Sequence, residues 1–340
     1  MKIITKLLFG LLLICAPSVQ ATHWGYWLAG LNLKLGLAQN VIGDLTLSMI
    51  ATKRLEMQIP TLPTVSENVL CWCHEKLKEH DMDPSAITIR VYDKQDIMAA
   101  FFNNCLLFHS QVVQQLDQAL HSNDVQSRVI VQTYSTLLDH EIGHLKSNDS
   151  ARFVACLAGT TTACGTLLAY LYKATHLKSL FCTPTNMKEL FKSYFVVGAI
   201  GMTTRSIIQH GNNAYSRHRE ALADDYAIMH AKDADSLICT AQYFERLDNQ
   251  LIDILCNKES MVNPNLPETV QFFLIGVRAH LHNAYTEQNP AEEFRAWLLK
   301  QTKLLDWIRF IVDPLHPSYP SRVEKLNRAA ENLKMQACAA

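Results

Sequence analysis

Two histidines and a glutamate stand close together in His140-Glu141-Ile142-Gly143-His144, the pattern HExxH. On a helix, residues four apart lie on one face, so both imidazoles can reach a single metal ion. The glutamate beside the first histidine can accept a proton from water held at that metal. The pattern predicts a zinc hydrolase centre in which His140 and His144 are metal ligands and Glu141 is the general base.

A second acidic pair follows in the segment RHREALADD, residues 217–225. A catalytic zinc site keeps three protein ligands and leaves its fourth position open, and His, His and Glu are an established set. Glu220 therefore fits the third ligand position for one zinc ion per chain. Asp224, one helical turn further on, is predicted to accept the spare ring N–H of a ligand histidine and so to fix its tautomer.

The two motifs together resemble the zinc metallopeptidase family that contains the CAAX prenyl endoproteases and the heat-shock protease HtpX. In that family a variable, often membrane-embedded hairpin separates the HExxH helix from a Glu-x-x-x-Asp helix, whose glutamate is the third ligand. The segment HPSYPSRV, residues 316–323, is similar to the family's closing His-Pro segment. The resemblance covers roughly Ile87 to Leu326.

The resemblance implies a zincin-like α+β fold, mainly α-helical, with a small β-sheet beside the HExxH helix. It implies a zinc-dependent endopeptidase that hydrolyses peptide bonds in unfolded or membrane-associated proteins, so the expected partners are protein or peptide substrates. Zinc would polarise the scissile carbonyl while Glu141 moves the proton of the attacking water. His316, or failing it Arg322, is predicted to donate to the oxyanion that forms during attack.

Other functions fit the same residues less well. HExxH can be an exposed helix face without a metal, although its pairing with Glu220 and Asp224 argues against that reading. A zinc-binding chaperone or assembly factor with latent or no proteolytic activity is the main alternative. A membrane-anchored interaction protein without metal is the third class.

Composition sets the frame for these predictions. The chain has 340 residues, 49% of them hydrophobic, which is enough for a full core, and its net charge of −1 gives no basic excess to suggest nucleic acid binding. We expect a globular or membrane-associated enzyme with one peptidase domain at 61–340. The pattern does not indicate an oligomeric state.

The first residues are typical of a targeting segment. Lys2 and Lys6 precede an apolar run that extends from Leu7 to Ala16, and Val19-Gln20-Ala21 offers a cleavage site. We predict a signal peptide at 1–21 and an exported protein, periplasmic or in the cell envelope. A retained anchor is disfavoured because about ten apolar residues are too few to span a bilayer. Residues 22–60 are predicted to be a helical lead-in, either amphipathic or packed in the core.

Ten cysteines are spaced irregularly, and removal of the leader would leave an odd number. Cys71-Trp72-Cys73-His74 has the composition of a metal site, but no matching second pair follows. We therefore predict structural cysteines, buried or paired in disulfides.

The elements that must position the zinc ligands can be placed by pattern. Ala86–Tyr92 and Cys105–Phe108 are predicted strands, and Val125–Lys146 is predicted to be the long helix that carries HExxH. By the resemblance, one edge of the sheet binds extended substrate, and Leu106–Phe108 could belong to it. Ala99-Ala100-Phe101 is the candidate counterpart of the family's Asn-Ala-Phe element.

An apolar hairpin is expected between the motifs, at 151–208, with charge-poor runs at Phe153–Tyr172 and Tyr194–Thr204. It could span a membrane, or it could be buried or interfacial. Beyond it, three or four helices are predicted, the last running from Ser321 towards Met335. The helical extension at 236–313 is expected to shape the cleft or to gate substrate entry.

Overall fold

The structure is a computed structural model that describes residues 50, 53–93, 98–101, 104–174, 187–256, 290–313 and 316–339. The predicted leader, most of the lead-in, Cys15 and Cys182 lie outside these residues. The chain divides into two units, one formed by 1–57 and 154–212 and the other by 58–153 and 213–340. Every residue predicted for the zinc site belongs to the second unit.

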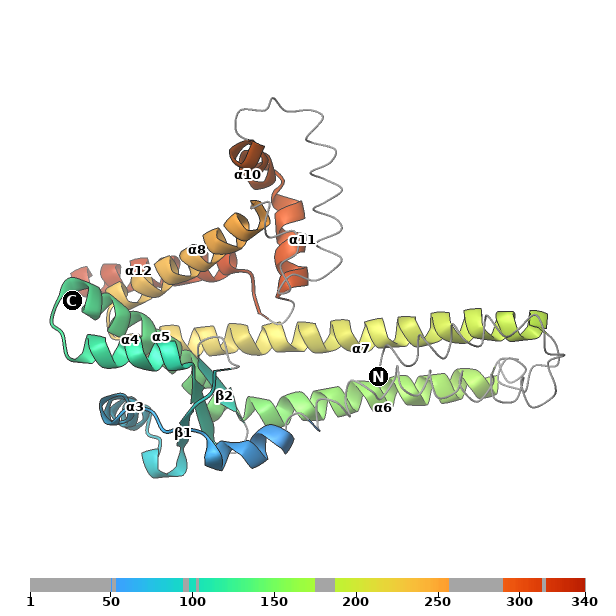
Figure 1. Cartoon of the computed structure of the whole chain (residues 1–340), viewed down its shortest axis with the longest axis horizontal. Coiled ribbons are helices and arrows are strands. Elements are labelled where there is room, and N and C mark those ends of the chain that lie inside the picture. The colour runs from blue at the N-terminus through green and yellow to red at the C-terminus, as the bar shows by residue number, and fades with distance from the viewer. Residues whose placement is uncertain are drawn as a thin grey trace. The chain divides into compact units, whose positions relative to one another are not determined.

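Helices dominate the fold, with one small sheet (Figure 1). The elements from the amino-terminal side are η1 (Ile59–Thr61), α3 (Glu67–Glu79), η2 (Pro84–Ala86), β1 (Thr88–Val91), β2 (Met98–Phe101), β3 (Cys105–Phe108), α4 (Ser110–Leu120) and α5 (Val125–Lys146). They are followed by α6 (Asp149–Ala174), α7 (Met187–His230), α8 (Ala234–Cys256), α10 (Pro290–Lys300), α11 (Thr302–Val312) and α12 (Tyr319–Ala339). The mainly helical α+β class is as predicted, and so are the bounds of α5.

Helix α5 begins and ends at polar residues that satisfy its backbone. The side chain of Asp124 accepts a hydrogen bond from the backbone N–H of Ser127, at 2.8 Å, which caps the amino terminus. At the other end the backbone N–H of Ser147 donates to the carbonyl of Gly143 at 3.1 Å, and Asn148 takes a positive φ of 49°. Asparagine tolerates this left-handed conformation, which stops the helix just after HExxH.

The sheet has the strand order β1-β3-β2, with β1 parallel and β2 antiparallel to β3. The prediction that Leu106–Phe108 belong to a substrate-binding edge is wrong, because β3 is the central strand and both of its sides are paired. Its four side chains are all buried, which explains why the strand is continuously apolar. Strand β2, which has no clear alternation in sequence, is an edge strand and contacts α5.

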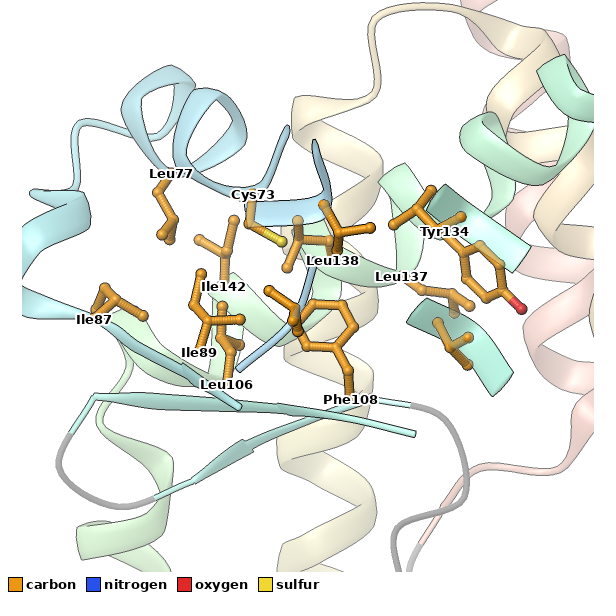
Figure 2. Close-up of a cluster of buried hydrophobic side chains, with 14 of the residues drawn as sticks. Cys73, Leu77, Ile87, Ile89, Leu106, Phe108, Tyr134, Leu137, Leu138 and Ile142 are labelled. Carbon is orange, nitrogen blue, oxygen red and sulfur yellow. The ribbon is translucent and has the colours of Figure 1, made fainter. Parts of the chain in front are cut away.

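The main core lies between the sheet, α3 and α5. Figure 2 shows Ile89, Leu106 and Phe108 of the sheet pointing toward Leu138 and Ile142 of α5. Cys73 and Leu77 of α3 close the cluster, and neither side chain is exposed to solvent. Helix α5, which carries HExxH, is therefore held on its buried face by apolar packing.

The cysteines within the described part of the chain are all free. Cys71 is exposed while Cys73 is buried, so the CWCH segment presents its two thiols to different environments. Burial raises the pKa of Cys73 far above its usual range and raises the pKa of Cys105 to about 11. These two thiols are buried, as predicted, whereas Cys71 and Cys338 are both free and exposed, so for them the prediction of buried or paired cysteines is wrong.

Four helices follow Asp233 in the described residues: α8, α10, α11 and α12. Helices α8, α10 and α11 share a second apolar cluster, which contains Ile252, Leu255, Cys256, Phe294, Leu298, Leu305 and Ile308. Helix α12 packs along α8. The predicted extension thus has a core of its own.

The other unit contains most of α6 and the first part of α7, the two described helices that fall in the range predicted as an apolar hairpin. Its described side chains include both buried residues, such as Leu157 and Val197, and exposed ones, such as Phe191 and Phe195. Thr160 donates a hydrogen bond to the side chain of Asn212 at 3.4 Å, which links the two helices. In the stretches that the structure describes, no helix has both the length and the hydropathy needed to cross a membrane.

Candidate metal centre

The three predicted ligands converge from two helices. His140 and His144 lie one turn apart on α5, and Glu220 reaches them from α7. Their nearest ligand atoms all lie within 4.8 Å of one another, and no other group of three potential ligands occurs in the described segments. All three side chains are largely shielded from solvent.

The spacing of the donor atoms fits a single tetrahedral ion. The Nε2 atoms of His140 and His144 are 3.2 Å apart, and they lie 3.2 Å and 3.3 Å from the two carboxylate oxygens of Glu220. Ligands about 2.0–2.1 Å from a tetrahedral zinc ion would be separated by about 3.3–3.4 Å. The donor set, two imidazoles and one carboxylate, is also one that zinc accepts in catalytic sites.

Negative charge predominates around the two imidazoles. The carboxylates are Glu141, Asp149, Glu220 and Asp224, against the guanidinium groups of Arg219 and Arg322. Burial alone would raise the pKa of Glu220, but hydrogen bonds with His140 and His144 outweigh it and hold this pKa well below its usual range. Burial would lower the pKa of His144, yet Asp149 and Glu220 raise it to about 10. The excess of carboxylates favours a cation at this site, and a bound metal would have to displace the protons of the two imidazoles.

Asp224 lies where the sequence predicted it. Its Oδ1 is 2.9 Å from Nδ1 of His140, so it can accept the ring N–H and leave Nε2 for a metal. Arg322 of α12 donates to the same carboxylate through Nε at 3.0 Å, and its guanidinium carbon lies 4.1 Å from the ring centroid of Phe244. Arg322 is buried and bound to Asp224, so its contacts are those of a residue that holds Asp224 in place.

His144 has a carboxylate partner that sequence reasoning missed. Its Nδ1 lies 2.7 Å from Oδ2 of Asp149, which in turn forms an ion pair with Arg219 at 3.2 Å. The signal was local, because Asn148 ends α5 and the first turn of α6 carries Asp149 back onto the histidine. Both candidate ligand histidines are therefore oriented by a buried carboxylate.

His316 approaches the cluster from the segment before α12. Its Nε2 is 3.6 Å from Oε2 of Glu220, and its Nδ1 lies 2.8 Å and 2.9 Å from the two carboxylate oxygens of Asp313. Burial would lower the pKa of His316, but Asp313 and Glu220 raise it above its usual value. The side chain is 42% exposed, so it borders open space beside the ligand cluster.

The approach of α7 to α5 depends on a tyrosine that faces the glycine of HExxH. A Cβ atom added at Gly143 would lie 3.1 Å from Cβ and 3.2 Å from Cγ of Tyr226. The Tyr226 hydroxyl lies 2.9 Å from Nδ1 of His80, whose Nε2 lies 2.7 Å from Asp139. The ring is thus fixed at both ends, and its helix carries Glu220.

We expect Gly143→Ala to weaken zinc binding. The new methyl group would meet the part of Tyr226 nearest its backbone, so α7 must shift and carry Glu220 with it. Overpacking of this kind costs about 1–3 kcal/mol in stability, which outweighs the gain of up to about 1 kcal/mol in helix propensity. Competition titration with a zinc chelator measures the zinc affinity, and chemical denaturation measures the stability.

Gly159→Ala is the matched control on α6, because a Cβ atom there meets nothing within 4 Å. It should raise stability by about 0.5–1 kcal/mol and leave zinc affinity unchanged. An equal gain in stability from Gly143→Ala, with wild-type zinc affinity, would show that the glycine does not set the approach of the helices.

Comparison with known proteins supports the same site. No curated protein and no solved structure matches the chain. A protein-family comparison, however, matches residues 73–330 to the description "Peptidase family M48". The match includes both histidines of HExxH, Glu220, Asp224 and the His316 segment, and it extends over most of the chain. The chain therefore belongs to peptidase family M48, the family of zinc metallopeptidases.

Proposed function

We propose that the protein is a zinc-dependent endopeptidase that hydrolyses peptide bonds in unfolded or membrane-associated proteins. The observation that carries this proposal is the convergence of three donor groups: the Nε2 atoms of His140 and His144 lie 3.2 Å apart, and each lies 3.2–3.3 Å from one carboxylate oxygen of Glu220. That spacing, together with the family, supports one zinc ion per chain.

Glu141 is assigned the proton transfers. It follows His140 on α5, and its charge acts on the imidazole of His144. When bound, zinc would supply a Lewis acid that polarises the scissile carbonyl and makes water more acidic. Glu141 takes the proton of the attacking water and then gives it to the leaving amine.

We assign His316 the role of hydrogen-bond donor to the oxyanion that forms during attack. The carboxylate of Asp313 can accept the Nδ1–H of His316, and a proton on Nε2 would make that atom the donor to the oxyanion. That Nε2–H is the one that lies beside the ligand cluster, at 3.6 Å from Glu220. Arg322 is less suited to the same task, since its guanidinium is buried on Asp224.

Substrate backbone is proposed to bind at β2. Within the described residues β2 pairs with β3 alone, and it contacts the helix that carries HExxH. An edge strand in this place can pair with an extended peptide and hold it near the metal. The targeting segment supports export, so we place the substrates in the periplasm or cell envelope.

The direct test is metal-dependent cleavage of an unfolded protein. Purified protein with one equivalent of zinc should cut a reduced, denatured protein at internal bonds, as read by mass spectrometry. A chelator should stop the cleavage and added zinc should restore it. Protein that retains its zinc and cuts none of several unfolded substrates would instead support the chaperone alternative.

His316→Gln should reduce kcat by about 10²–10³-fold, the usual cost of one lost oxyanion donor, with little change in KM. Zinc content should stay at the wild-type level, because His316 is not among the three ligands. Steady-state kinetics on one cleaved peptide, with metal analysis of the same sample, measures both quantities. A wild-type kcat would remove His316 from the mechanism.

A further inference from the structure

A cavity of about 350 Å³ lies in the second unit, beside the candidate metal centre. Its walls come from α7, α8, α11 and the segment that leads into α12. Most of the lining is apolar, from Leu247, Leu251, Ile254, Phe310, Val312 and Tyr319. A cavity of this kind favours an apolar ligand, because burying the apolar surface of that ligand lowers the free energy.

The charged groups in the lining are largely neutralised by one another. Arg309 donates to both carboxylate oxygens of Asp248, at 2.8 Å and 2.6 Å, and to Asp306 at 2.9 Å. Asp313 is engaged by His316 at 2.8 Å. Side chains that are already ion-paired attract a charged ligand only weakly, so the lining gives no preference for an acidic or a basic group.

Arg217 adds to this picture. Its guanidinium carbon lies 4.9 Å from the ring centroid of Phe310, which is within the range of a cation–π contact. The contact links α7 to α11 across the cavity wall. It makes Phe310 a fixed part of the lining.

The cavity adjoins the proposed reaction centre through one residue. His316 contributes to its lining, while the Nε2 atom of the same ring lies 3.6 Å from Glu220. A peptide whose scissile carbonyl lies beside His316 and Glu220 would therefore have a neighbouring side chain at the mouth of the cavity. The position is that of a specificity pocket.

The helical extension keeps this wall rigid. Leu251 and Val312 line the cavity and also pack against the second apolar cluster of α8, α10 and α11. Leu298 and Ile308 in that cluster have no exposed surface. Because the wall is backed by a packed core, its shape can discriminate between side chains.

We propose that this cavity binds a large apolar side chain of the substrate, next to the scissile bond, and so sets cleavage specificity. The inference rests on the proposed peptidase function and names the substrate class of that site. It also gives the segment 236–313 a role, since α8 and α11 supply most of the pocket.

The test is a cleavage-site profile on a mixed peptide library, for zinc-loaded wild type and three variants. Wild type should select Leu, Phe, Met or Tyr at one position beside the cut. Leu251→Trp, which fills the cavity, should move that preference to small residues and lower kcat/KM for large ones by about 10–200-fold. Ile254→Arg, at a side chain that is 38% exposed, should bring acidic residues into the same position.

Asn249→Trp is the control, because Asn249 lies on α8, is exposed and does not line the cavity. It should keep the wild-type profile. Circular dichroism and zinc content check the fold, and Ile254→Arg decides the matter if Leu251→Trp does not fold.

Two outcomes would overturn the inference in different ways. If Leu251→Trp and Ile254→Arg bind zinc and cut the library with the wild-type profile, the cavity is not the specificity pocket, and the peptidase function stands. If zinc-loaded wild type cuts no peptide in the library, the proposed function is wrong, and so is the assignment of the cavity as its specificity pocket.

Discussion

Glu141→Gln is expected to lower peptide hydrolysis by about 10²–10⁴-fold, the range that a general base contributes. The amide keeps the size of the side chain but cannot take the proton of the attacking water. Zinc should remain at one equivalent, because Glu141 is not one of the three ligands. Initial rates on a single peptide, measured with the zinc content of the same preparation, test both halves of this prediction.

Glu245→Gln is the companion substitution, at an exposed glutamate of α8, and should leave the rate unchanged. If Glu141→Gln hydrolyses peptides at the wild-type rate, another group moves the proton. If it loses hydrolysis but keeps the biological activity of the protein, the zinc serves a chaperone or assembly role.

Glu220→Ala is expected to lose both metal and activity. The substitution removes one of the three donors and leaves His140 and His144 facing an empty corner of the site, 3.2 Å and 3.3 Å from where the carboxylate oxygens lay. Zinc affinity should fall by more than the roughly 10–100-fold that loss of a mere ligand-orienting partner costs. Competition titration against a chromophoric chelator gives the affinity.

Asp225→Ala serves as its control on α7. Asp225 is exposed and forms an ion pair with Lys325 at 2.9 Å, so its loss removes an acidic residue of the same helix without touching the ligand cluster. It should bind zinc as wild type does. Equal zinc affinity in Glu220→Ala and wild type would mean that the third ligand is another residue.

The pairing of residues within each motif could be predicted because the spacing is a property of the helix itself. His140 and His144 are four apart, and Glu220 and Asp224 are four apart, so each pair shares a face whatever surrounds it. The predicted bounds of α5 agree with the structure, where Asp124 caps its amino terminus. Local rules were sufficient at these positions.

Contacts that depend on tertiary placement could not be predicted. Nothing local shows that Tyr226 would oppose Gly143, or that Nε2 of His316 would lie 3.6 Å from Glu220, since each pairing joins segments whose approach is set by the whole core. Arg322 illustrates the same limit. Its type suits an oxyanion donor, but its surroundings bind it to Asp224.

Strand order was the clearest error. Leu106–Phe108 were expected to contribute to the substrate edge, yet β3 is central and β2 takes the edge. A continuously apolar strand is typical of the middle of a sheet that is covered on its faces, which is the pattern of β3. The antiparallel return of β2 was not visible, because Met98–Phe101 lacks the alternation of an exposed edge strand.

Anomalous X-ray diffraction at the zinc absorption edge tests the central claim most directly. We predict one peak per chain, about 2.0–2.2 Å from Nε2 of His140, Nε2 of His144 and a carboxylate oxygen of Glu220. A zinc peak held by the two histidines with the Glu220 carboxylate out of bonding reach, or no peak between α5 and α7, would contradict the account.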